Sequence, residues 1–162
     1  MEETEHKVDK SEWPRGPWDH EPDKVIWKHD GFDCMIVRNS LGNLCGYVGV
    51  KEGHPWFGKD YNDVDAEVHG GLTYSDYCAG HICHPDDESG GKTFWLGFDC
   101  AHLGDLVPGL RSYMDSPRGF GPYGQDDYKD IRYVSSETEG LARQAKEAMP
   151  KKRRYVDLSG GE

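Results

Sequence analysis

Residues 24–50 decide the fold of this chain, and they read KVIWKHDGFDCMIVRNSLGNLCGYVGV. Three runs rich in β-branched and aromatic residues, at 24–28, 32–37 and 44–50, are separated by two short polar stretches, which is typical of strands and turns. The first separator contains Asp30-Gly31, a pair that suits the positive backbone φ angles of tight hairpins. The stretch therefore predicts a three-stranded antiparallel meander.

Two further strands and one helix are expected after this meander. Residues 66–74, interrupted by two glycines, and residues 93–99 have the composition of strands. Between residues 126 and 148 the apolar side chains recur at helical spacing, with Asp126 or Asp127 available as the N-cap. We therefore expect an α+β fold, in which a mostly antiparallel sheet of about five strands is backed by one long C-terminal amphipathic helix.

Length and charge limit the organisation of the chain. A length of 162 residues fits one domain, which we expect to span 23–149. Residues 1–22 are predicted to be an extended Pro-rich arm held by Trp13 and Trp18, and 150–162 a flexible basic tail. With 30 acidic against 19 basic residues the net charge is −11, which argues against general nucleic-acid binding.

The compartment follows from the cysteines and from the first residues. Five cysteines are an odd number, which excludes a complete disulfide framework and favours reduced thiols or metal ligation. Three of the first six residues are glutamates, unlike the basic start of a signal peptide. No stretch approaches the roughly 18 apolar residues of a membrane span. We therefore expect a cytoplasmic protein without a membrane partner.

Candidate catalytic residues gather in the middle of the chain. Five of the eight histidines lie between residues 54 and 102, interleaved with cysteines and aspartates, and these residue types perform acid–base and metal chemistry. A carboxylate at a strand end can orient an imidazole, although short polar residues there also cap turns. The candidate catalytic residues are His69, Asp99, His102 and Asp105. A divalent metal, Zn or Mg/Mn, is the one cofactor that such a site would use.

A second grouping, Cys78-Ala-Gly-His-Ile-Cys-His84, supplies candidate metal ligands. Cys78, Cys83 and His84 are of the right types, but structural zinc sites usually draw on two separated pairs of ligands, and this spacing is irregular. The alternative is that the cysteines are free and buried as small apolar groups, with histidines at the surface between them.

Candidate ligand-binding residues flank the catalytic candidates. Trp95 and Gly97 share the face of Asp99 by the two-residue alternation of a strand, which predicts an aromatic wall beside bare backbone. Glycines after His69 allow a ligand to approach the backbone closely, although they also fit a plain glycine bulge. The full candidate set is Gly70, Gly71, Thr73, Tyr74, Trp95 and Lys59.

Five motifs between residues 46 and 105 carry a resemblance. They are Gly46-Tyr-Val-Gly-Val50, Gly53-His-Pro55, Val68-His-Gly-Gly-Leu-Thr73, Ile82-Cys-His84 and Gly97-Phe-Asp-Cys-Ala-His-Leu-Gly-Asp105. Together they resemble a family of small uncharacterised proteins encoded in bacteriophage and prophage genomes. The resemblance implies a viral origin and action in the cytoplasm of a bacterial host. It brings no known reaction and therefore assigns no catalytic residue.

Three functions are open at this point. The first is hydrolysis of a nucleotide-like small molecule, such as a host defence signal, by a His/Asp site with or without a metal. The second is a binding protein that sequesters such a molecule, with Lys51, Lys59, Lys92 or Arg111 meeting its phosphates. The third is an acidic inhibitor of a host defence protein. A homo-oligomer is compatible with each of them.

Overall fold

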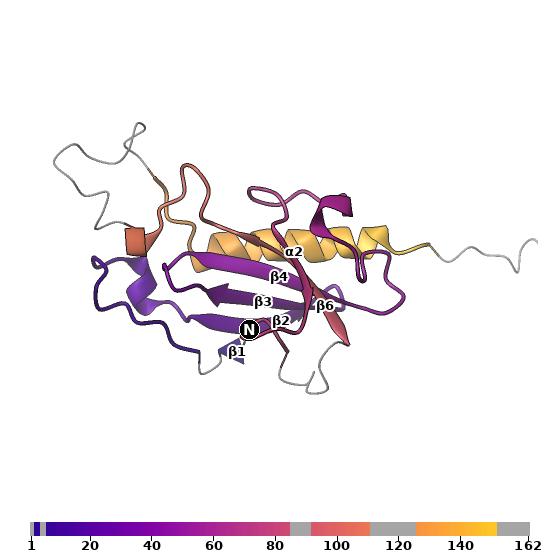
Figure 1. The fold of residues 1–162 in the computed structure, drawn as a ribbon, viewed down its shortest axis with the longest axis horizontal. Coiled ribbons are helices and arrows are strands. Elements are labelled where there is room, and N and C mark those ends of the chain that lie inside the picture. The colour runs from indigo at the N-terminus through magenta and orange to yellow at the C-terminus, as the bar shows by residue number, and fades with distance from the viewer. Residues whose placement is uncertain (1, 4–5, 85–91, 111–125, 152–162) are drawn as a thin grey trace, which may run out of the picture.

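The computed structural model describes residues 2–3, 6–84, 92–110 and 126–151, which form an antiparallel sheet with one long helix across it (Figure 1). The strands are β1 (Glu2–Glu3), β2 (Lys24–His29), β3 (Phe32–Arg38), β4 (Leu44–Lys51), β5 (Tyr74–Tyr77) and β6 (Thr93–Asp99), and the helix is α2 (Ile131–Ala148). Their order in the sheet is β1-β2-β3-β4-β6-β5. The expected α+β class is confirmed, with the two-residue strand β1 added at one edge.

The predicted meander of β2, β3 and β4 is present. Asp30 and Gly31 form the two-residue turn between β2 and β3, and both have positive φ angles, +52° and +85°. The register places His29 opposite Phe32 and carries all of β2 along β3. Strand β6 then pairs with β4 over its whole length and separates β4 from β5.

The strand expected at residues 66–69 is absent, and only the end of that stretch is regular, as β5. Helix side chains take the place of a strand partner. The amide group of Gln144 bonds Glu67 twice, accepting from its N–H and donating to its carbonyl, each at 2.8 Å. Glu137 accepts the N–H of His69 at 2.7 Å. Because α2 bonds the backbone of Glu67 and His69, residues 66–69 lie against the helix without pairing with a strand. The chain rejoins the sheet at Thr73, whose N–H donates to the carbonyl of Gly97 in β6 at 2.9 Å.

The helix begins later than its periodicity suggested. Asp130, and neither Asp126 nor Asp127, is the N-cap, and its carboxylate accepts the N–H of Tyr133 at 2.9 Å. Asp127 instead pairs its backbone with the segment around Asp105. This pairing fixes the chain that leads into α2 beside the turn that follows β6.

The two faces of the sheet are covered differently. The face toward α2 carries the larger core, where α2 contributes the fully buried Val134, Leu141, Ala142 and Ala145. The opposite face, called here the open face, carries a smaller cluster: Ile26, Met35, Val37, Cys45, Tyr47 and Trp95. Cavities remain on the open face because no helix of the described part of the chain packs there.

The arm is fixed to the domain by a buried carboxylate. Asp23 accepts hydrogen bonds from the N–H of Val8 at 2.7 Å, the amine of Lys10 at 2.8 Å and the guanidinium of Arg38 at 2.7 Å. Burial raises the pKa of Asp23, but these hydrogen bonds outweigh that effect and hold it below its ordinary value. Trp18, one of the two predicted anchors, is 4% exposed. Of the expected basic tail, residues 152–162 lie outside the described residues.

No helix in the described ranges is long and apolar enough to cross a membrane.

Candidate functional site

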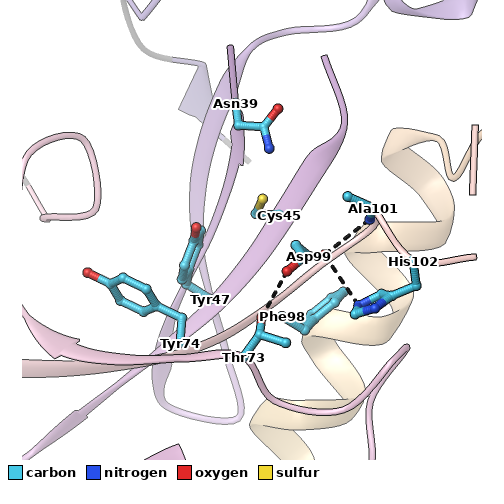
Figure 2. A pocket seen from close by; sticks show the side chains of 9 residues that line it. All are labelled: Asn39, Cys45, Tyr47, Thr73, Tyr74, Phe98, Asp99, Ala101 and His102. Atoms are coloured by element: carbon cyan, nitrogen blue, oxygen red, sulfur yellow. Dashed lines mark hydrogen bonds and ion pairs between the residues drawn. The ribbon is translucent and has the colours of Figure 1, made fainter. Parts of the chain in front are cut away.

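A cavity of about 490 Å³ lies on the open face beside the end of β6 (Figure 2). Its lining residues are Asn39, Cys45, Tyr47, Thr73, Tyr74, Phe98, Asp99, Ala101 and His102. The volume is in the range of sites for small molecules, roughly 300–1,000 Å³. We call it the first cavity.

Asp99, the last residue of β6, contacts several polar groups of the first cavity. It accepts the hydroxyl of Thr73 at 3.0 Å and the N–H of Ala101 at 3.1 Å, and Figure 2 shows its carboxylate pointing toward His102. His102 Nε2 lies 3.3 Å from Asp99 Oδ1, which makes an ion pair when the imidazole is protonated, without the alignment of a hydrogen bond. A carboxylate and an imidazole therefore face the cavity as a pair, each about one third exposed.

Asp105 lies behind this pair and holds the loop that carries it. Its side chain is only 3% exposed, and its Oδ2 accepts both the N–H of His102 at 3.0 Å and Nε2 of His69 at 2.8 Å. The amine of Lys129 lies 3.3 Å from the other carboxylate oxygen. Asp105 therefore fixes the position of two histidines and has a cation beside it that compensates its burial.

His69 is held at both ring nitrogens. Nε2 faces Asp105, which only accepts when ionised, so in the neutral ring Nε2 carries the proton and Nδ1 accepts the hydroxyl of Tyr133 at 2.9 Å. Burial raises the pKa of Tyr133, which keeps its phenol protonated as that donor. The ring of His69 lies 5.8 Å from the ring of His102, edge to face.

The four candidate catalytic residues therefore come together, from the segment before β5, from the end of β6 and from the turn after β6, but in two layers. Asp99 and His102 line the first cavity, whereas His69 and Asp105 do not. The structure places the second pair where it orients the first.

The two candidate glycines serve the site in a different way from the one expected. Gly70 has a φ angle of +70°, and a Cβ built there would lie 2.2 Å from Nε2 of His102. The close approach that Gly70 permits is thus to His102 and not to a ligand. Gly71 also has a positive φ, +83°, but nothing lies within 4 Å of a Cβ at that position.

Trp95 does not form the expected wall. It is fully buried, and Tyr47 packs over Gly97, where an added Cβ would meet the Tyr47 ring at 2.3 Å. The aromatic residues that do line the first cavity are Tyr47, Tyr74 and Phe98, so Tyr74 lies where it was expected.

The candidate lysines lie elsewhere. Lys51, Lys59 and Lys92 do not line the first cavity, and Arg111 lies outside the described residues. Burial raises the pKa of the Cys45 thiol to about 12, and it also raises that of Tyr47. Asp99 and His102 are the carboxylate and the imidazole that line this cavity.

The cysteine grouping takes a different form from the expected thiols. Cys78 and Cys83 are joined in a disulfide, which leaves neither sulfur as a thiolate ligand for a metal. His84 lies 4.0 Å from a carboxylate oxygen of Asp33. Within the described ranges, no group of three or more His, Cys, Asp or Glu side chains is arranged to hold a metal ion.

Sequence reasoning missed three residues of the site: Lys129, Tyr133 and Glu137. Each belongs to α2 or to the segment that leads into it, and each contacts His69 or Asp105. The available signal was weak, because on a helix an exposed tyrosine beside charged residues looks like an ordinary solvent face.

No protein-family model, no curated protein and no solved structure matches the chain.

Proposed function

We propose that this protein is a hydrolase that cleaves a phosphoester bond of a nucleotide-like small molecule in the first cavity. The observation that carries the proposal is the Asp99–His102 pair, which faces a cavity of ligand size and is backed by the buried Asp105. A positioned imidazole with a carboxylate partner is the usual acid–base device of hydrolysis, and it contributes about 10²- to 10⁴-fold to a rate.

The reaction needs one proton to move from water to the leaving oxygen. Neutral His102 takes a proton from water as the water oxygen bonds to phosphorus. The imidazolium then gives this proton to the leaving oxygen as its bond to phosphorus breaks. Asp99, 3.3 Å away, stabilises the imidazolium in between, and Asp105 acts as a positioning residue through the backbone of His102.

An anionic ligand in the first cavity needs a positive charge beside it. The carboxylate of Asp99 repels an anionic ligand, and while His102 is neutral as the base, this repulsion has to be offset by a cation that the ligand brings or by the imidazole of His69, whose ring lies 5.8 Å from that of His102. Lys129 is already paired with Asp105 at 3.3 Å.

The direct test incubates the protein with cyclic and linear nucleotides and measures hydrolysis by chromatography. His102→Gln is expected to lose at least about 10²-fold in rate. The matched control is His29→Gln, because His29 lies at the turn after β2, away from the first cavity. If no nucleotide is cleaved at high enzyme concentration, the hydrolase proposal is wrong.

Adding EDTA separates two forms of this chemistry. The acid–base pair as described works without a metal, so activity is expected to survive EDTA. Activity that is lost with EDTA and restored by Zn²⁺ or Mn²⁺ would instead support the metal-assisted form of the reaction.

A second candidate function is sequestration of the same kind of molecule without cleavage. The observation that favours it is that both ring nitrogens of His69 are already bonded and that Nε2 of His102 is shielded from solvent. Tight binding in calorimetry, with the ligand recovered intact after denaturation, would identify this function. Retention of that binding in His102→Gln would strengthen it.

The resemblance to phage-encoded proteins supplies the biological setting of the proposal. We propose that the protein acts in the cytoplasm of a bacterial host, on a nucleotide-derived defence signal. A phage carrying His102→Gln should then form fewer plaques than its parent on a host with such a defence, and equal numbers on a host without it. Equal plaque numbers on both hosts would argue against this setting.

A further inference from the structure

A second cavity, of about 500 Å³, lies on the open face next to the first. The two share Asn39, Cys45 and Tyr47, so Tyr47 stands between them. The remaining lining residues of the second cavity are His6, Lys7, Val8, Asp9, Val37, Arg38, Ser40, His81 and Ile82. It is therefore bordered by the N-terminal arm on one side and by the disulfide-closed loop 78–83 on the other.

Two histidines from these distant segments meet at the second cavity. The rings of His6 and His81 lie 4.1 Å apart. His6 Nε2 lies 3.2 Å from the carbonyl of Arg38, so this nitrogen carries a proton, and the amine of Lys24 donates to the carbonyl of His81 at 2.6 Å. The His6 ring is thus held by a hydrogen bond at one nitrogen, and the backbone of His81 is held by Lys24 while its ring lies against that of His6.

The carboxylates around this cavity are occupied by other partners. Asp9 accepts the N–H of Ser11 at 2.9 Å, within its own turn. Asp23 and Glu21 pair with the guanidinium of Arg38, whose side chain is fully buried. The charge of the cavity is therefore set by the carboxylate of Asp9 on one side and by the exposed Lys7 and the two imidazoles of His6 and His81 on the other.

We propose that the second cavity is an anion subsite, in which His6, His81 and Lys7 bind a phosphate group of the ligand. This extends the proposed function, because the same ligand would reach past Tyr47 to the Asp99–His102 pair. The substrate would then carry two phosphate groups separated by a ring system, as in a dinucleotide, with one phosphate held in the second cavity and the other hydrolysed in the first.

The two imidazoles predict how binding depends on pH. The charge of His6, then burial and Lys24, lower the pKa of His81, so phosphate-free His81 is largely neutral at pH 7. The groups near the pair are Lys7, Lys24 and Asp9, two of them cationic. A bound phosphate offsets this positive charge and draws a proton onto His81, so its affinity should rise as the pH falls from about 7 to about 6.

The test follows the histidine ring signals by NMR while pyrophosphate is added to the full-length protein. His6→Gln and His81→Gln assign the two signals, and His29→Gln serves as the control. Pyrophosphate in the millimolar range should shift the signals of His6 and His81 together. His81→Gln should weaken this binding about tenfold, the loss of one charge-assisted hydrogen bond, whereas His29→Gln should leave it unchanged.

The outcomes separate this inference from the proposed function. Shifts at His6 and His81 without cleavage of any nucleotide would keep the anion subsite and overturn the hydrolase. Shifts at His102 alone would overturn the subsite and leave the hydrolase standing. The absence of any shift, or equal affinity in His81→Gln and His29→Gln, would also overturn the subsite.

Discussion

Replacing Gly70 by alanine tests whether backbone shape at this glycine controls the position of His102. Gly70 and Gly71 both have φ angles in the left-handed region, +70° and +83°, where an alanine costs about 1 kcal/mol. The two differ in their surroundings. A Cβ at Gly70 would lie 2.2 Å from Nε2 of His102, whereas a Cβ at Gly71 meets nothing within 4 Å. Gly71→Ala is therefore the matched control.

The expected magnitudes follow from this geometry. Both variants should lower the melting temperature by about 2–4 °C, the effect of about 1 kcal/mol on a chain of this size. In Gly70→Ala the His102 ring must also move by more than 1 Å, because the 2.2 Å separation has to reach at least 3.4 Å for ordinary van der Waals contact, and this move changes its 3.3 Å approach to Asp99. A misplacement of about 1 Å costs about 10²-fold in catalytic rate.

The assay combines thermal unfolding, the NMR signals of the His102 ring, and the hydrolysis rate. Gly70→Ala should shift the His102 signals and lose about 10²-fold in rate, while Gly71→Ala should do neither. The NMR readout does not depend on the proposed activity. If both variants shift His102 equally, or if neither does, the assigned role of Gly70 is wrong.

Three further predictions concern stability. Asp105→Asn should lower the free energy of unfolding by about 2–3 kcal/mol in urea titrations, because hydrogen bonds to a buried charge are lost; a change below 1 kcal/mol would contradict this. Burial lowers the pKa of His54 more than the Ala145 carbonyl raises it, so the unfolded chain binds the proton more readily and stability should fall as the pH drops below about 6.5. His54→Gln should flatten that pH dependence between about pH 7 and pH 5. Reducing the Cys78–Cys83 disulfide with dithiothreitol should cost about 2 kcal/mol, and Cys78→Ser should be insensitive to the reductant.

The parts of the fold that were predictable are those whose partners are near in sequence. The meander follows from three β-rich runs joined by short turns, and Asp30-Gly31 marks the first turn directly. The strand expected at residues 66–69 was not predictable in this way. Its backbone partners are side chains of Glu137 and Gln144, about 70 residues away, and strand composition carries no information about them.

In the candidate site, too, some features could be predicted from the sequence and others depend on residues far away in the chain. Residue types and the strand end at Asp99 identified the four candidate residues, because these side chains suit acid–base chemistry wherever they meet, but the pairing of His69 with Asp105 was not predicted. The two-residue alternation of a strand predicted on which face of the sheet Trp95 lies, but not which side chains cover it there. Tyr47 and its neighbours bury Trp95 on that face. The role of Tyr133 depends on how α2 lies against the segment that carries His69, which only the tertiary structure determines.

The anchoring of residues 64–73 on α2 also sets the order in which a newly made chain acquires its site. The ribosome releases the N-terminal part of a chain first, so the β2–β4 meander can form while α2 is still being synthesised. Until Tyr133, Glu137 and Gln144 have left the ribosome, His69 lacks its hydrogen-bond partners on the helix. The backbone of Glu67 then also lacks its hydrogen bonds to Gln144. Nascent chains that end before residue 131 should therefore acquire a protease-resistant meander while residues 64–73 stay open to cleavage.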